Sequence, residues 1–220
     1  MKKRLVSLLV AACMIFALLP VSAITAFAEE SVLTGYCGAD NSCESQTYNY
    51  STQYNGAAQT FTGTYYSNAI WTLTSNGADG ADTYKLTISG TGQMGDFGTS
   101  WSFGKPWNFE LIQKRNVAVG DVYHAVTELK ITDGITEIGA HAFEAHQAIT
   151  HVVLPQSVTK IGENSFNYCK GMQSIELSNN LEEIGSTALS DTALTSIELP
   201  ESLKKFKRKL FSTVRHLREI

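Results

Sequence analysis

The C-terminal half of the chain repeats itself with a period of 22 or 23 residues. Isoleucines followed by glycine stand at Ile138, Ile161 and Ile184, and Phe206 takes the next position in that column. Three further columns of bulky apolar residues keep the same spacing: Phe143, Phe166, Leu189 and Phe211; Val126, Ile149, Met172, Leu194 and Leu217; Leu129, Val152, Ile175, Ile197 and Ile220. A fixed period of this length predicts a repeat architecture, because one unit cannot bury its own apolar face and neighbours must stack.

Apolar residues at offsets 1, 4 and 6 of each unit are typical of leucine-rich repeats, which supply one short strand per turn. We expect such strands at residues 174–177 and 196–199, with offsets 4 and 6 pointing inward, since side chains alternate along a strand. The glycine after each isoleucine is expected to allow a backbone turn toward the Phe column. In the last unit Phe206-Lys207 replaces Ile-Gly, and the final repeat is incomplete.

The outward positions at offsets 3 and 5 form two ladders along the expected concave side of a solenoid, where repeat proteins usually bind partners. For any single residue, solvated surface is the simpler interpretation, but the face as a whole is the better candidate for binding. Its residues are Glu128, Lys130, His151, Val153, Ser174, Glu176, Ser196 and Glu198.

The N-terminus has the pattern of an export signal. A basic start at residues 2–4 precedes an apolar run over 5–21, and Ala26-Phe27-Ala28 offers a small-x-small cleavage site. We therefore expect a signal peptide over 1–28 and a mature chain that begins near Glu29. An uncleaved anchor is the weaker alternative, because Pro20 interrupts the apolar run. No later segment approaches the roughly 20 apolar residues that span a bilayer.

Residues 29–120 have a different texture, rich in Gly, Thr, Ser and aromatic residues, and contain all three tryptophans. Period-two alternation at 69–74 and 84–89 predicts half-buried strands, and Asn76-Gly77 marks the turn between them. We interpret 29–120 as a small β-rich, aromatic region that caps repeats over 121–220. The predicted fold class is mixed β/α, a leucine-rich-repeat solenoid of period 22–23 preceded by this β-rich region.

Cysteine and charge patterns add two candidate sites. Export permits a disulfide between Cys37 and Cys43, which flank a short polar loop, whereas the repeat phase of Cys169 indicates a packed residue. The segment from 204 to 220 holds seven Lys or Arg and one acid. An anion-binding patch is possible there, although a solvated edge is the simpler alternative. The patch residues are Lys204, Lys205, Lys207, Arg208 and Lys209.

Catalytic and metal sites are not favoured by the sequence. His141, His146 and His151 occupy different repeat phases and should diverge in space, whereas a closed metal site needs converging ligands. A nucleophilic cysteine needs a thiolate beside a base, and the phase of Cys169 is a buried one. No phosphate-binding glycine loop is present. We therefore expect no metal, cofactor, nucleic-acid partner or enzymatic activity.

The clearest copy, residues 149–169, reads ITHVVLPQSVTKIGENSFNYC. It resembles the BspA-like leucine-rich repeats of bacterial surface and secreted proteins, and Trp71-Thr72-Leu73 and Pro106-Trp107 resemble the β-rich segment that often precedes them. The resemblance implies a secreted or cell-surface module that binds an extracellular protein or cell-surface ligand. The alternatives are an N-terminal structural piece of a larger wall-associated protein, and a secreted hydrolase acting through Cys169 or the histidines.

Overall fold

The structure is a computed structural model that describes residues 32–38, 44–54, 57–76, 83–98, 105–115, 117–118 and 120–206. The predicted signal peptide lies outside these residues. Two described helices, α3 (Pro106–Arg115) and α4 (Val122–Ala125), precede the repeats, and the described residues 126–206 contain no helix. The described chain is therefore rich in strands with few helices, and its described repeats are built from strands and turns.

The N-terminal part forms one sheet of five strands, β1 (Leu33–Gly38), β2 (Ser45–Tyr54), β3 (Ala57–Ser75), β4 (Tyr84–Gly90) and β6 (Val126–Ile131). Strand β3 is central and pairs antiparallel with β1, β2 and β4. The two strands predicted from period-two alternation are present, since Trp71 and Leu73 on β3 and Leu86 and Ile88 on β4 are buried. Strand β4 then pairs in parallel with β6, so the repeats continue this sheet directly.

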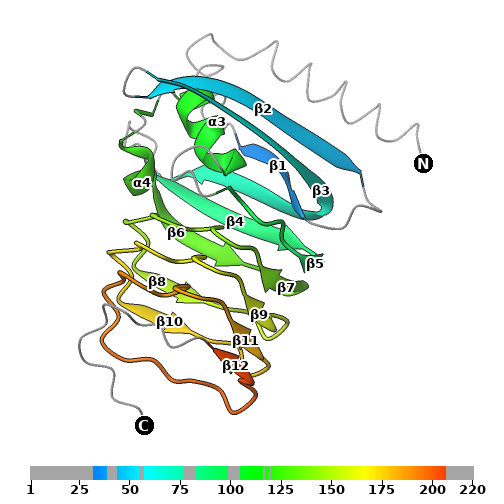
Figure 1. The fold of residues 1–220 in the computed structure, drawn as a ribbon, viewed down its shortest axis with the longest axis vertical. Helices are drawn as coiled ribbons and strands as arrows, with labels where there is room; N and C mark the ends of the chain where they lie inside the picture. Colours follow the sequence, from blue (N-terminus) through cyan, green and yellow to red (C-terminus); the bar gives the residue numbers. More distant parts are fainter. Residues whose placement is uncertain are drawn as a thin grey trace, which may run out of the picture. The chain divides into compact units, whose positions relative to one another are not determined.

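The repeats stack by parallel pairing of short strands on two sides (Figure 1). One side continues from β6 to β8 (His151–Val153) and β10 (Ser174–Glu176), which pair with each other. The other side is a continuous parallel sheet of β5 (Gly92–Gln93), β7 (Ile135–Ile138), β9 (Lys160–Ile161), β11 (Glu183–Ile184) and β12 (Lys205–Phe206). Because β4 pairs with β6 and β5 with β7, the N-terminal region supplies the first strand on both sides.

Irregular turns complete each repeat and explain why no helix forms there. Two residues per repeat have a left-handed backbone conformation: His141, Ala145, Asn164, Tyr168, Thr187 and Asp191, with φ from 53° to 65°. Such residues end right-handed helical turns. Hydrogen bonds between repeats satisfy the turn backbone instead, for example Phe143 N–H to Ser165 O at 2.7 Å and Phe166 N–H to Ala188 O at 2.9 Å.

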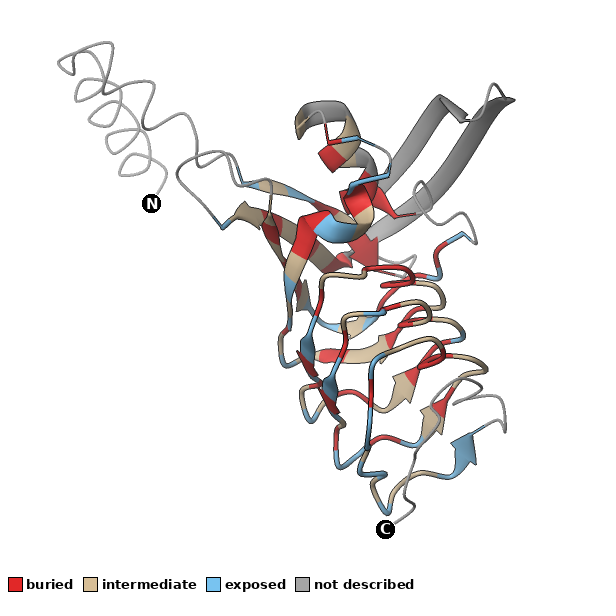
Figure 2. Cartoon of the chain, turned by 90° about the vertical axis from the view of Figure 1, so that its left-hand side faces the viewer, coloured by how far each residue is buried: buried red, intermediate tan, exposed pale blue. Residues whose placement is uncertain are grey.

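The apolar columns predicted from the period form the core (Figure 2). Ile138, Ile161 and Ile184 are at most 1% exposed, and the rings of Phe143 and Phe166 stack with centroids 5.3 Å apart. Among the described column residues, Leu129 and Ile197 are only partly buried, and Phe206 is 57% exposed. The isoleucine and phenylalanine columns are therefore confirmed as inward positions up to the last described repeat.

The glycines after these isoleucines have a different role from the expected one. The described glycines with positive φ are Gly90, Gly92 and Gly134, so Gly162 and Gly185 need no special backbone conformation. A Cβ on either residue would lie 2.5 Å from a backbone nitrogen of the preceding repeat. Their function is close approach of neighbouring repeats, and the prediction of a turn requirement was wrong.

The strand expected at 196–199 is absent, although residues 174–176 form β10 as predicted. Leu199 should point inward at offset 6 but is 41% exposed, whereas the equivalent Leu154 is 2% exposed. The last described unit thus lacks inward packing at offset 6, although Leu194 is buried and Ile197 packs against the core.

Candidate binding face

All eight predicted binding residues are exposed, and most lie on three successive strands. Strand β8 has the burial pattern exposed, buried, exposed, and β10 repeats it. In register, His151 pairs with Ser174 and Val153 with Glu176, while Val152 and Ile175 between them are buried. Period-two alternation therefore produces the outward ladder, which we call the β6–β8–β10 face. Ser196 and Glu198 are exposed beyond β10 but do not belong to a strand.

Several exposed polar side chains on this face contact one another. His151 Nδ1 lies 2.6 Å from Ser174 Oγ, and its Nε2 lies 3.6 Å from Glu176 Oε1. Lys85 Nζ on β4 lies 3.4 Å from Glu128 Oε2. The side chains in these ion pairs are 40% to 69% exposed, and exposed pairs contribute only about 0–1 kcal/mol. A partner could therefore displace these contacts at small cost.

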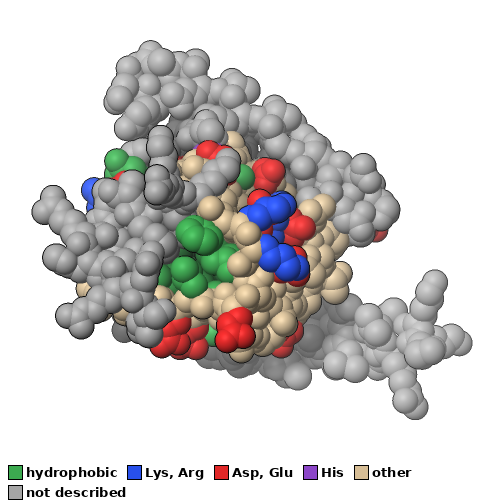
Figure 3. All heavy atoms as spheres, turned by 60° about the horizontal axis from the view of Figure 1, so that its bottom comes forward, with side chains coloured by type: hydrophobic (Ala, Val, Ile, Leu, Met, Phe, Trp, Pro, Cys, Tyr) green, Lys and Arg blue, Asp and Glu red, His purple; other side chains and the backbone are tan. Residues whose placement is uncertain are grey.

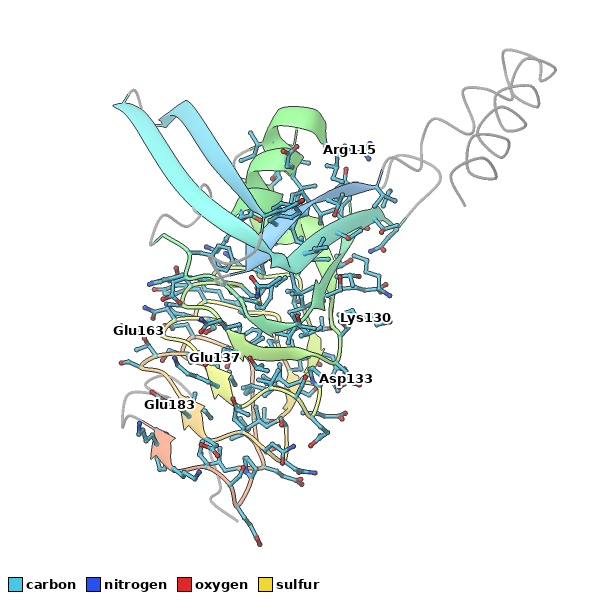
Figure 4. The ribbon with its side chains drawn as sticks, turned by 90° about the vertical axis from the view of Figure 1, so that its right-hand side faces the viewer. Arg115, Lys130, Asp133, Glu137, Glu163 and Glu183 are labelled. Atoms are coloured by element: carbon cyan, nitrogen blue, oxygen red, sulfur yellow. The ribbon has the colours of Figure 1, made fainter. Side chains whose placement is uncertain are left out.

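Two charged side chains on the same side of the repeats have no polar partner within the described part of the chain. Lys130 is the fifth residue of β6, and Asp133 follows that strand. Both are exposed, and Figure 4 shows them on the same side of the ribbon. Their charges remain available to a ligand.

A groove of about 1020 Å³ lies on this face where the strand pairing is interrupted. Strand β6 belongs to the five-stranded sheet and β8 to the two-stranded one, and no described ladder joins them. Val153 is 48% exposed in the groove, beside the buried Leu154. The lining includes four predicted binding residues, Glu128, Lys130, His151 and Val153.

The other predicted surface and cysteine sites are only partly described. Lys204 Nζ lies 2.7 Å from Glu182 Oε1 and Lys205 Nζ lies 3.7 Å from Glu183 Oε2. Figure 3 shows basic and acidic side chains together at this end of the repeats, beside a hydrophobic cluster. Lys207, Arg208 and Lys209 lie outside the described residues, and the anion-binding patch stays a prediction.

Cys37 is fully buried in β1, and burial raises the pKa of its thiol above the usual range. Cys43 lies outside the described residues, so its disulfide with Cys37 stays a prediction.

Sequence reasoning missed a buried cluster where helix α3 meets the first repeat. Trp107 is fully buried, packs against Phe143 with ring centroids 5.8 Å apart, and donates from Nε1 to His146 Nε2 at 3.2 Å. Lys105 is also fully buried, and burial lowers its pKa to about 8, opposed by the nearby charge of Glu144. The only sequence signal was a run of polar residues, Glu144 and His146, at core positions of a repeat.

The three central histidines have separate surroundings. His141 Nδ1 lies 2.9 Å from Glu144 Oε2, His146 is buried against Trp107, and His151 lies on the exposed face. No cluster that could hold a metal ion occurs among the described residues. Cys169 donates to Phe143 O at 3.1 Å, and burial raises its pKa to about 12. A thiol held in this form is a poor nucleophile, which disfavours the hydrolase alternative at this residue.

Within the described residues, no helix is both long and apolar enough to cross a membrane.

Comparisons with known proteins identify the repeats. Residues 123–220 match the family model of the BspA type leucine rich repeat region, in six copies. No curated protein matches the chain.

Two solved structures are similar. A leucine-rich repeat protein from Eubacterium ventriosum ATCC 27560 is 28% identical with a TM-score of 0.48, over 62% of this chain and 31% of that one. Another from Bacteroides ovatus ATCC 8483 is 29% identical with a TM-score of 0.40, over 46% of this chain and 27% of that one. The chain thus spans less than a third of the length of the solved proteins that it matches. Residues 123–220 thus form BspA-type leucine-rich repeats.

Proposed function

We propose that the chain is exported, that its repeats form a leucine-rich-repeat solenoid, and that the β6–β8–β10 face binds an extracellular protein. The observation that carries the proposal is the coincidence of the predicted ladder with the groove of about 1020 Å³. An exposed aliphatic residue, Val153, lies there among available charges, such as Lys130. Protein interfaces combine such an apolar centre with a polar rim. We propose binding rather than catalysis, because Ser174 and His151, which lie 2.6 Å apart on this face, are exposed on an open strand surface, whereas catalytic sites exclude water.

The binding experiment uses the chain from Glu29 onward, immobilised and probed with purified extracellular-matrix proteins and with intact cells. Val153→Asp places a charge at the apolar centre and should weaken binding by about tenfold or more. Glu163→Lys is the control for a charge change elsewhere on the surface, since Glu163 is exposed and lies away from the groove-lining residues. Equal binding by both variants would contradict the assignment of this face.

Export is tested separately by expressing the full chain in a bacterium and measuring the mass of the secreted product. We expect an N-terminus at Glu29, because signal peptidase cleaves after small-x-small sites. Retention of an uncleaved chain in the membrane would contradict the proposed export.

A further inference from the structure

One column of the β6–β8–β10 face carries opposite charges on either side of an exposed aliphatic residue. Lys130 on β6, Val153 on β8 and Glu176 on β10 occupy the same repeat position, 23 residues apart. Val153 and Glu176 pair in register, and Val153 and Lys130 line the same groove. The column therefore runs positive, apolar, negative along the stacking direction.

Each member of this column is available to a partner. Lys130 has no hydrogen bond or ion pair within the described part of the chain. Val153 is 48% exposed and is one of four exposed large hydrophobic residues in the described ranges. Glu176 contacts His151 at 3.6 Å, but both side chains are at least half exposed, so water and salt already weaken this pair.

A column with this pattern is its own complement. Consider a second copy that faces this one and is related to it by a 180° rotation about an axis between the two faces, parallel to β8. This rotation lays β6 of one copy over β10 of the other. Lys130 then faces Glu176 twice, once on each side, and Val153 faces Val153 at the centre. Glu128 faces Ser174 in this arrangement, so no acidic residues of the three strands oppose each other. Strands that pack face to face in this way remain aligned, as in β-sandwiches.

We propose that the β6–β8–β10 face pairs with a second copy of the chain as a two-fold symmetric dimer. The proposal rests on the proposed function, because it names the partner of the same face. A foreign protein would have to carry the reversed charge pattern, whereas the chain itself already carries it. The opposite orientation, with the axis running across the strands, would place Lys130 against Lys130 and is disfavoured by like-charge repulsion.

The dimer is tested by sedimentation velocity on the chain from Glu29 onward, from about 1 to about 200 μM at low salt. The wild type should form a concentration-dependent dimer. Lys130→Glu and Glu176→Lys should each weaken it by about tenfold or more, because either change makes both cross-contacts repulsive. Glu163→Lys changes the charge by the same amount away from the groove, and should leave the dimer unchanged.

Mixing the two charge-reversed variants is the decisive arm. In a mixed dimer, the introduced glutamate at position 130 of one copy faces the introduced lysine at position 176 of the other. The second contact joins the unchanged Glu176 of the first copy and the unchanged Lys130 of the second. The mixture should therefore dimerise like the wild type, and so should the chain that carries both changes. Far-ultraviolet circular dichroism of each variant checks that the fold is retained.

The proposal is overturned if the wild-type chain stays monomeric. It is also overturned if both charge-reversed variants dimerise as strongly as the wild type, or if mixing the two variants does not restore dimerisation. These outcomes are separable from failure of the proposed function. If the monomeric wild type binds an extracellular protein and Val153→Asp abolishes that binding, the face is a protein-binding face and only its pairing with itself is wrong. If Val153→Asp changes neither property, both proposals fall.

Discussion

Lowering the pH from 7 to 5 should destabilise the chain through His146. The residue is 1% exposed, with Nε2 3.2 Å from Trp107 Nε1 and Nδ1 3.3 Å from Glu144 O. An indole N–H can only donate, so Nε2 must be an unprotonated acceptor, while Nδ1 carries the proton and donates to the carbonyl. Protonation of the ring would place a second donor against the indole N–H. The fold therefore favours the neutral ring.

The size of the effect follows from the difference between the folded and unfolded pKa. Burial, helped by the nearby charge of Lys105, lowers the pKa of His146 to about 3, from 6.5. Between these values the unfolded chain binds a proton that the folded chain does not, so stability is lost as the pH falls below 6.5. At pH 5 the loss is about 2 kcal/mol, at about 1.36 kcal/mol per pH unit. That is a large share of a typical stability of about 5–15 kcal/mol.

The assay is urea unfolding at pH 7 and pH 5, followed by circular dichroism. His146→Gln should lose less than about half as much stability between these pH values, since its amide oxygen can accept from Trp107 and does not titrate. His151→Gln is the control, because it replaces an exposed histidine by the same residue and leaves His146 in place. The reasoning is refuted if the wild type loses less than about 0.5 kcal/mol, or if His146→Gln loses as much as the wild type.

Three further predictions concern packing and a buried charge. Gly162→Ala should lower the free energy of unfolding by about 1–3 kcal/mol, because its Cβ would lie 2.5 Å from backbone. Gly120→Ala, with nothing within 4 Å of its Cβ, should change it by less than about 0.5 kcal/mol in the same urea assay. Phe166→Ala should cost about 3–5 kcal/mol, against less than about 1 kcal/mol for the 57% exposed Phe206→Ala, and equal losses would contradict the assigned core. Burial lowers the pKa of Lys105 from 10.5 to about 8, so between these values the unfolded chain binds the extra proton and stability rises with pH. The stability difference between wild type and Lys105→Met should therefore shift in favour of the wild type by about 2–3 kcal/mol from pH 7 to pH 10, and a constant difference would contradict this.

The core of the repeats could be predicted because a fixed period places equivalent residues in equivalent surroundings. Once the repeat register was assigned, Ile138, Ile161 and Ile184 were predicted to occupy equivalent positions. Because stacked repeats bury equivalent apolar residues, all three were expected to point inward. The exposed ladder followed from alternation along β8, where Val152 is buried and its neighbours are not. Periodicity thus transfers information from one repeat to the next, which ordinary globular sequences do not offer.

Features that depend on contacts between different parts of the chain could not be predicted. Lys105 and Trp107 lie outside the periodic region, so nothing in their spacing showed that they would pack against His146. The role of Gly162 was misassigned because the sequence does not reveal how closely neighbouring backbones approach. The prediction of a strand at 196–199 was wrong for a related reason. The periodic sequence pattern continues there, but Leu199 is exposed and does not pack inward.

The two strand columns of the repeats use their charges differently, and this difference supports assigning the binding role to one side. On the continuous sheet the sign alternates at one repeat position along Glu137, Lys160, Glu183 and Lys205. Lys160 Nζ lies 3.0 Å from Glu137 Oε2 and Lys205 Nζ 3.7 Å from Glu183 Oε2, so these charges are used within the stack. If one repeat stacked out of place by a single repeat, residues of like charge would lie opposite each other, whereas a displacement by two repeats would keep opposite charges together. The alternation therefore disfavours stacking that is wrong by one repeat. On the opposite side Lys130 has no such partner in the described part of the chain (Figure 4). The charge of Lys130 is therefore not used to fix the register of the repeats and can contribute to binding a partner. Lys130 lines the groove, which places this charge where we propose that the partner binds.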